Sequence, residues 1–310
     1  MTRLKTLSGK PVSRLTFGTM QFGGAADEAA SRLMFAATTN AGINHFDTAN
    51  GYTDGHSERI LGAMVSAVRD DYFVATKAGF DGGAGRANLT AQFEDSRQRL
   101  DVDCVDLLYL HRWDDSTPLD ETFETLAELQ QNGKVRHIGV SNFAAWQVMK
   151  AQAVAAAFDT RIDAIQPMYN LVKRQAEVEL FPMAIDQGIA IFPYSPLGGG
   201  LLTGKYSAGE TGRLTEDQRY AARYGPDWMH HTAHALAELA AAHRVPAATL
   251  AVAWAKAHPA SPSPIISARS VEQLESSLDA MNLDLHEDLY AQISALSRTP
   301  APATDRLEEA

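Results

Sequence analysis

Short apolar runs alternate with longer stretches of helical periodicity along most of the chain. After Ser57, for example, apolar residues recur three and four positions apart as far as Val68, which predicts an amphipathic helix. The apolar runs often carry hydrophobic residues at consecutive positions, as expected for strands buried on both faces. Eight of these runs are candidate strands, at residues 15–18, 43–46, 73–76, 105–110, 135–140, 164–166, 189–193 and 264–266.

The predicted helices have recognisable ends. Three of them are expected to end at Gly42, Gly133 and Gly188, each directly before a strand, because glycine adopts the left-handed conformation at a helix end without a steric penalty. Thr117 followed by Pro118 predicts a helix start, with the threonine as N-cap and the proline in the first turn. These boundaries favour a regular alternation of strands and helices.

Eight strands that alternate with helices form either a closed barrel or an open, doubly wound sheet. An open sheet usually carries a Gly-x-Gly-x-x-Gly loop after its first strand, and the segment from Gly18 to Gly24 lacks this spacing. We therefore predict an α/β protein with a (β/α)8 TIM barrel fold, formed by residues 1–310 as a single domain. Apolar segments on both sides of Gly9 predict a short N-terminal hairpin that closes the bottom of the barrel.

Two segments lack a periodic pattern. Residues 206–227, after the seventh strand, form the longest irregular stretch, and long loops in compact domains are often functional. We expect this loop to cover the active site. Residues 300–310 contain two prolines and end in charged residues, so they are expected to form a loose tail.

Composition and charge limit the classes of partner that the chain is expected to bind. The chain of 310 residues has a formal net charge of −11 and no long block of like charge, which argues against binding to nucleic acid or to an anionic membrane. No long apolar run predicts a membrane span or a signal peptide, and Cys104 has no second cysteine to pair with. A cytoplasmic protein is the expectation, and the oligomeric state stays open.

Polar residues recur where the predicted strands end. The C-terminal ends of all barrel strands meet at one mouth, where the active sites of such barrels lie. Any one of these residues alone fits an ordinary loop, but the repetition along the chain favours a shared site. They are Asp47, Lys77, His111, Ser141 with Asn142, Gln166, Tyr194 with Ser195, and Ser267 with Arg269.

Four residues suggest a proton-transfer mechanism. A phenol such as Tyr52 is a weak acid near neutral pH, and an ammonium such as Lys77 would lower its pKa, whereas burial would raise it. Asp47 would keep the lysine charged, and His111 would orient a carbonyl oxygen. The residues alone also allow an ordinary ion pair, a packed tyrosine and a core histidine.

Beyond these features, the sequence resembles the aldo-keto reductases, from Phe17 to Gln273. The resemblance implies a (β/α)8 barrel that reduces aldehydes or ketones with NADPH. It further implies that Tyr52 is the general acid, that Lys77 and Asp47 support it, and that His111 orients the carbonyl. The motifs that carry it are, in chain order, Asp47-Thr-Ala with Tyr52, Ser57-Glu58, Thr76-Lys77, Leu110-His111, Gly139-Val-Ser-Asn-Phe143, Gln166-Pro-Met-Tyr-Asn170 and Tyr194-Ser-Pro-Leu197.

The resemblance also assigns a cofactor site. It implies that Ser141, Asn142 and Gln166 bind the nicotinamide carboxamide and that Tyr194 stacks on the ring. The segment that would lie along the pyrophosphate contains Ser195, Leu197 and Gly199, and the group that would bind the adenosine 2′-phosphate is Ser267, Arg269 and Gln273. Because Arg269 precedes a capping-box sequence, a cation and a helix N-terminus coincide there, which favours NADP(H), with NAD(H) as the alternative.

The sequence defines the substrate pocket less clearly than the cofactor site. Met20, Trp113 and Trp228 are candidates for the pocket, with core or surface packing as the alternative for each. His230 and His234 have a spacing that suits zinc, but no third ligand is in view, so no metal is expected. Two other functions stay open: an NAD(P)+-dependent sugar or alcohol dehydrogenase, and a regulatory subunit that senses a bound nucleotide.

Overall fold

All eight strands of the computed structural model, which describes residues 4–306 and 308, pair in parallel. The pairing order β7-β6-β5-β4-β3-β2-β1-β8 leaves β7 and β8 at the edges. The Ser263 amide donates to the Ile191 carbonyl at 2.9 Å and the Ile265 amide to the Pro193 carbonyl at 2.8 Å, and these bonds close the barrel. The strands are β1 (Thr16–Gly18), β2 (His45–Asp47), β3 (Phe73–Ala78), β4 (Val105–Leu110), β5 (Val135–Ser141), β6 (Ile162–Gln166), β7 (Ala190–Ile191) and β8 (Ile265–Ile266).

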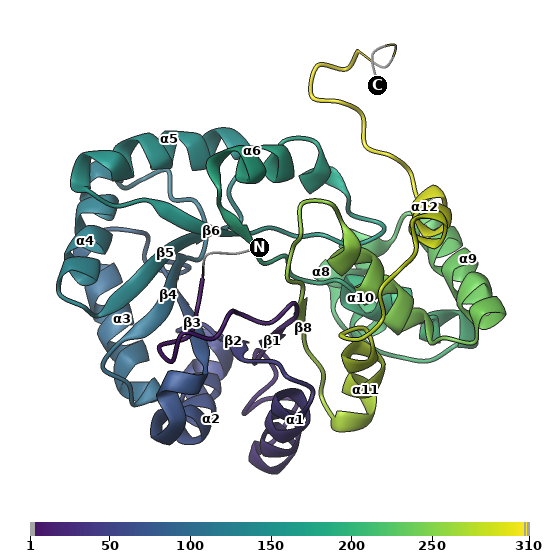
Figure 1. Cartoon of the computed structure of the whole chain (residues 1–310), viewed down its shortest axis with the longest axis horizontal. Coiled ribbons are helices and arrows are strands. Elements are labelled where there is room, and N and C mark those ends of the chain that lie inside the picture. The colour runs from purple at the N-terminus through teal and green to yellow at the C-terminus, as the bar shows by residue number, and fades with distance from the viewer. Residues whose placement is uncertain (1–3, 307, 309–310) are drawn as a thin grey trace.

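Helices surround the strands (Figure 1), so the predicted (β/α)8 architecture is confirmed. They are α1 (Glu28–Asn40), α2 (His56–Val65), α3 (Arg86–Leu100), α4 (Leu119–Gln131), α5 (Ala145–Ala155), α6 (Leu180–Gln187), α7 (Arg213–Glu216), α8 (Gln218–Tyr224), α9 (Asp227–His243), α10 (Ala247–Ala257), α11 (Val271–Asp279) and α12 (Glu287–Ala295).

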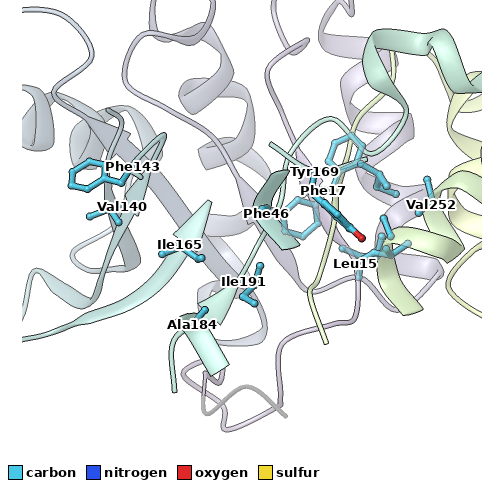
Figure 2. Packing of buried hydrophobic residues seen from close by; sticks show 14 of the residues in the cluster. Leu15, Phe17, Phe46, Val140, Phe143, Ile165, Tyr169, Ala184, Ile191 and Val252 are labelled. Atoms are coloured by element: carbon cyan, nitrogen blue, oxygen red, sulfur yellow. The ribbon is translucent and has the colours of Figure 1, made fainter. Parts of the chain in front are cut away.

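The buried hydrophobic residues form two clusters because successive side chains of a strand point to opposite faces. The outer cluster lies between strands and helices: Phe46 and Ile191 of the strands share it with Val252 of α10 (Figure 2). The inner cluster fills the barrel and includes Phe73, Ala75, Leu107, Tyr109, Ala164, Ala190, Phe192 and Ile265. A filled interior is typical of this fold and provides a rigid base for a site at the mouth.

The N-terminal segment turns back on itself beside the barrel. Lys5 and Pro11 form one antiparallel bridge, and the turn between them contains Gly9 at φ 84°. Leu4 and Val12, on the two sides of this turn, belong to the inner cluster. The segment thus contributes apolar side chains to the barrel interior.

Three of the predicted helix ends agree with the structure, and one predicted helix start differs from it. Gly42, Gly133 and Gly188 all have positive φ, as expected for glycines that follow a helix. Thr117 is not the N-cap of α4, so this prediction was wrong. Its hydroxyl donates to the Asp114 carboxylate at 2.6 Å, and Pro118 takes the cap position before Leu119.

The stretch at 206–227 is more regular than predicted, since it carries the short helices α7 and α8. Neither helix is long enough to show the periodicity of an amphipathic helix, which explains why the sequence suggested a loop. At the C-terminus, the described part of the segment after α12 runs away from the barrel (Figure 1). Positions 307, 309 and 310 of the predicted tail lie outside the described residues.

Candidate active site

The alternation of side chains brings the polar strand-end residues into one place. In β3, Phe73 and Ala75 face the barrel interior, so Lys77 is the next inward position at the C-terminal end. In β6, Ala164 faces inward and Gln166 follows two positions later. The same rule applied to the second through eighth strands gives Asp47, Lys77, His111, Ser141, Gln166, Tyr194 and Ser267.

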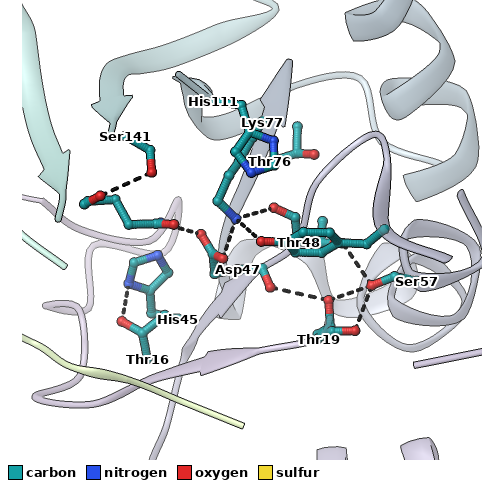
Figure 3. A network of polar contacts seen from close by, with 12 residues as sticks. Thr16, Thr19, His45, Asp47, Thr48, Ser57, Thr76, Lys77, His111 and Ser141 are labelled. Atoms are coloured by element: carbon teal, nitrogen blue, oxygen red, sulfur yellow. Dashed lines mark hydrogen bonds and ion pairs between the residues drawn. The ribbon is translucent and has the colours of Figure 1, made fainter. Parts of the chain in front are cut away.

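Lys77 is the centre of the hydrogen-bond network at this mouth (Figure 3). Its Nζ lies 2.5 Å from Asp47 Oδ1 and donates to the Thr48 carbonyl at 2.7 Å and to the Tyr52 hydroxyl at 3.2 Å. The second Asp47 oxygen accepts from Gln166 Nε2 at 2.8 Å. The ammonium and the carboxylate are both buried, so each depends on the other for its charged state.

Burial and charge act in opposite directions on this group. Burial raises the pKa of Asp47, and the ammonium of Lys77 opposes that change. Burial also raises the pKa of the Tyr52 hydroxyl, while Lys77 favours the phenolate. For Lys77, burial disfavours the charged form, but the attraction of Asp47 and Tyr52 prevails and its pKa is raised. Tyr52 therefore keeps its proton near neutral pH, beside a cation that stabilises the phenolate once the proton leaves.

His111 lies on the other side of Tyr52. The two ring centroids are 5.9 Å apart with an interplanar angle of 79°, and the Phe80 ring lies 4.9 Å from the imidazole. Burial, together with the charges of Lys77 and Arg112, lowers the pKa of His111 to about 3. The imidazole is therefore neutral near pH 7 and can donate one hydrogen bond to a substrate oxygen.

The loop that carries Tyr52 has an unusual backbone that needs support. Thr53, Asp54 and Gly55 follow it with φ values of 47°, 54° and 82°, in the left-handed region. Glu58 is fully buried nearby, where it accepts from the Thr76 hydroxyl at 2.6 Å and lies 3.3 Å from Arg99. The loop is thus fixed by buried polar contacts to β3 and α3.

The proposed nicotinamide ligands lie in one connected group. The Ser141 hydroxyl donates to the Gln166 carbonyl at 3.0 Å and accepts from Asn142 Nδ2 at 3.0 Å. The Tyr194 hydroxyl donates to Asn142 Oδ1 at 2.7 Å. Asn142 itself has a φ of 60°. The structure therefore brings these four residues together directly beside Asp47.

The candidate phosphate-binding residues lie after β7 and β8. Gly198, Gly199 and Gly200 have φ values of 57°, 66° and 96°. The Arg269 amide donates to Gln273 Oε1 at 3.2 Å, and the Gln273 amide donates to the Ser270 hydroxyl at 3.4 Å. The Gln273 side chain thus bonds to the backbone of Arg269, the residue before the N-cap Ser270. The capping box is therefore shifted by one residue. The adjacent Ser267 hydroxyl is buried and has no hydrogen-bond partner among the described residues.

A pocket of about 560 Å³ opens at the barrel mouth, a volume typical of ligand sites. Met20 lines this pocket together with Tyr52, His111 and Arg269. The other two candidates for the substrate pocket are not among its lining residues. Trp113 packs on Phe143 and Trp146, and Trp228 lies in a separate groove of about 400 Å³ beside Arg298. Trp228 is the second residue of α9, and it shares its groove with residues at the end of α12.

Two findings concern metal ions and membrane-spanning helices. No group of three or more histidine, cysteine, aspartate or glutamate side chains is arranged to hold a metal ion there. None of the described helices combines the length and the apolar character needed to cross a membrane.

Comparison with known proteins agrees with this geometry. The model of the aldo/keto reductase family matches residues 14–298. The chain belongs to the aldo/keto reductase family. An uncharacterized oxidoreductase, YrpG of Bacillus subtilis, is 34% identical over 96% of both chains. A probable voltage-gated potassium channel subunit beta from rice is 30% identical over 89% of both chains. Rat aflatoxin B1 aldehyde reductase member 2 is 38% identical, over 65% of this chain and 57% of its own.

Membership of the aldo/keto reductase family and the similarity to oxidoreductases support an oxidoreductase activity on carbonyl compounds. They also confirm the family resemblance inferred from the ordered motifs.

Several pocket residues were missed by the sequence analysis. Phe80 packs on His111, and five charged residues of the α7–α8 segment line the same pocket. The sequence pattern predicts only that the segment as a whole covers the active site. The four-residue spacing of two of its arginines was the available signal, because residues four apart share one face of a helix. These charged residues are Arg213, Glu216, Asp217, Arg219 and Arg223.

Proposed function

We propose that this chain reduces aldehydes or ketones to alcohols with NADPH as the electron donor, in a reversible reaction, and that residues 1–310 act as one catalytic domain. The observation that carries the proposal is the position of the Tyr52 hydroxyl. It lies 3.2 Å from the Lys77 ammonium, faces His111 and borders the pocket at the barrel mouth.

Tyr52 acts as the general acid. When a substrate carbonyl lies in the pocket, the Tyr52 hydroxyl gives its proton to the carbonyl oxygen, and the new O–H bond replaces the phenolic one. The phenolate that remains is stabilised by Lys77, whose charge is maintained by Asp47. Neutral His111 donates a hydrogen bond to the same oxygen and fixes its orientation. Bound NADPH would supply the hydride for the carbonyl carbon.

The residues present suit such a cofactor. Ser141, Asn142 and Gln166 offer amide and hydroxyl groups for a carboxamide, and the half-buried Tyr194 offers an aromatic face. Three consecutive glycines with positive φ allow the backbone beside Ser195 and Leu197 to approach phosphate oxygens. The Ser267 hydroxyl, which lacks a hydrogen-bond partner within residues 4–306 and 308, and the partly exposed Arg269 suit the 2′-phosphate that distinguishes NADPH from NADH.

A regulatory role is the second candidate. Its support is the similarity to the rice protein named as a probable potassium channel subunit beta, which covers most of both chains. Such a role would use the same network with slow turnover and tight cofactor retention.

A sugar or alcohol dehydrogenase would instead run the proton transfer of Tyr52 in reverse, with NAD(P)+.

The test is a screen of the purified protein for NADPH oxidation with aldehydes, ketones and sugars, together with NADP+ and NAD+ reduction by alcohols. We expect many turnovers with at least one class of small carbonyl compound, and weaker activity with NADH. Less than one turnover per bound cofactor for every carbonyl tested, with a cofactor that stays bound to the protein, would contradict a reductase and favour the regulatory role.

A further inference from the structure

The Tyr109 hydroxyl is a buried polar group that the proposed reaction does not use. Tyr109 is fully buried in the inner cluster, yet its hydroxyl has no hydrogen-bond partner among the described residues. Buried polar groups are nearly always hydrogen-bonded in native proteins, because an unpaired one destabilises the fold. A phenylalanine would fill the same space without this cost. The hydroxyl is therefore expected to form its bond in another state of the protein.

The Tyr109 ring lies over the neighbouring strand β5. Tyr109 of β4 pairs in register with Gly139 of β5, and Gly139 pairs with Ala164 of β6. A Cβ atom at Gly139 would lie 2.5 Å from Tyr109 Cδ1, so the ring occupies the space that a side chain at position 139 would fill. Gln166 is the next inward position of β6 after Ala164. The hydroxyl at the far end of the ring is thus directed toward the strand that carries Gln166.

The charge and the dipole that act on this hydroxyl belong to Asp47 and Gln166. Burial raises the pKa of Tyr109 well above its ordinary value, the Asp47 carboxylate raises it further, and the Gln166 side chain opposes the rise. The two neighbours are also bonded to each other, since Gln166 Nε2 donates to Asp47 Oδ2 at 2.8 Å. A phenol that keeps its proton is a hydrogen-bond donor. Tyr109 is therefore a second donor beside the carboxylate that Gln166 binds.

Gln166 has two roles that compete for its amide group. In the structure the amide nitrogen binds Asp47, and in the proposed function the same side chain binds the nicotinamide carboxamide. If Gln166 turns to the carboxamide, Asp47 keeps Lys77 Nζ at 2.5 Å from Oδ1 but loses the donor at Oδ2. A buried carboxylate that loses a donor is destabilised. A replacement donor would therefore strengthen the binding of the cofactor.

We propose that Tyr109 is a positioning residue of the cofactor site, whose hydroxyl donates to Asp47 when Gln166 turns to the nicotinamide carboxamide. The inference rests on the proposed function, because it takes NADPH to bind beside Gln166. The exchange of donors keeps Asp47 ionised and in place, so that Lys77 stays charged beside Tyr52 while the cofactor is bound. In the free protein the hydroxyl has no such bond to lose.

The replacement Tyr109→Phe tests the free and the bound state separately. Without cofactor, Y109F should unfold at the same urea concentration as the wild type or at a higher one, because no hydrogen bond is removed. In a fluorescence titration, Y109F should bind NADPH about tenfold more weakly or worse, the effect of one lost hydrogen bond to a charged group. A purely structural role of the hydroxyl would give the reverse, a lower unfolding midpoint with unchanged affinity.

Tyr169 provides the matched control. It is also fully buried, but its hydroxyl already donates to Glu177 Oε1 at 2.7 Å, and neither residue lines the pocket at the barrel mouth. Y169F should therefore lower the unfolding midpoint of the free protein and leave the NADPH affinity within about twofold. The two variants remove the same group from equally buried rings and differ in whether that group is paired.

A second pair of variants tests the exchange without any cofactor. In Q166M, Asp47 lacks the Gln166 donor already in the free protein, so the Tyr109 hydroxyl should bind Asp47 there. The double variant Q166M/Y109F should then unfold at a lower urea concentration than Q166M, although Y109F alone does not lower the midpoint. Such coupling between two substitutions indicates that the two side chains serve the same partner.

Three results would overturn the inference: equal NADPH affinity of Y109F and the wild type, equal midpoints of Q166M and Q166M/Y109F, or a lower midpoint of Y109F alone. The last result would mean that the hydroxyl already has a partner in the free protein, such as an internal water molecule. If the wild type does not bind NADPH, the proposed function fails. A lower midpoint of the double variant would then support the exchange of donors for a different ligand of Gln166.

Discussion

Replacement of Lys77 by methionine perturbs the most tightly connected residue of the site. The change keeps most of the side-chain volume but removes the ammonium, which lies 2.5 Å from Asp47 and also bonds to the Thr48 carbonyl and to Tyr52. The Asp47 carboxylate would then be buried with Gln166 as its remaining side-chain donor. Removal of one partner of a buried ion pair costs about 3–5 kcal/mol in free energy of unfolding, a large share of the total stability of a typical domain.

A double-mutant cycle measured by urea unfolding tests this reasoning. K77M should lose about 3–5 kcal/mol, and D47N, which leaves the lysine without its anion, should also be destabilised. The double variant K77M/D47N should lose clearly less than the sum of the two, since no buried charge is left without a partner. Its turnover should stay low, because nothing stabilises the Tyr52 phenolate. Additive losses, or a K77M variant as stable as the wild type, would refute the view that the two charges depend on each other.

Three further predictions concern the pH dependence of stability, the choice of cofactor and the support of the Tyr52 loop. Burial, with the charge of Lys77, lowers the pKa of His45 and of His111 to about 3. Both imidazoles therefore stay neutral in the folded chain, whereas in the unfolded chain they bind protons below about pH 6.5. Stability should therefore fall as the pH falls from 7 to 5, by about 2 kcal/mol for each histidine, and urea unfolding of H45Q should show a shallower pH dependence. R269Q should weaken NADPH binding about tenfold or more while NADH binding changes little, and equal losses in cofactor titrations would contradict a 2′-phosphate site. E58Q should lower kcat more than it changes KM, because Glu58 supports the Tyr52 loop. Steady-state kinetics measure this change, and unfolding measurements on the same variant show whether a loss of stability alone explains it.

The alternation of strands and helices was predictable because the barrel repeats one simple pattern. Each strand is a short apolar run, and glycines such as Gly133 and Gly188 end the helices before the next strand. The strand ends were predicted to within two residues, and β2 extends to Asp47 itself. The convergence of Asp47, Lys77 and His111 followed from the topology, since all strand ends of a barrel meet at one mouth.

The residues that were missed depend on contacts between distant segments. Periodicity cannot reveal α7 and α8, because each is about one or two turns long. Trp228 shares a groove with residues at the end of α12, a contact between distant segments that no local pattern encodes. The support of the Tyr52 loop by Glu58 and Arg99 joins α2 to α3 and is visible only in three dimensions.

The balance between burial and charge at Tyr52 also needed the structure. The sequence suggested that Lys77 lowers the pKa of the phenol and that burial raises it, without a way to rank the two. In the structure burial prevails, so the pKa of Tyr52 is raised although Lys77 lies 3.2 Å away. In the proposed reaction the lysine would then serve chiefly to stabilise the phenolate after proton transfer.

The replacement of Tyr52 by phenylalanine tests the central claim most directly, because it removes one hydroxyl and keeps the ring that faces His111. The measurement is NADPH oxidation by an aldehyde under single-turnover conditions, with NADPH affinity determined by fluorescence titration on the same samples. Loss of a general acid should slow the reaction about 10²- to 10⁴-fold and leave the affinity for NADPH within about twofold. A reaction rate within threefold of the wild type would contradict the role of Tyr52 as proton donor.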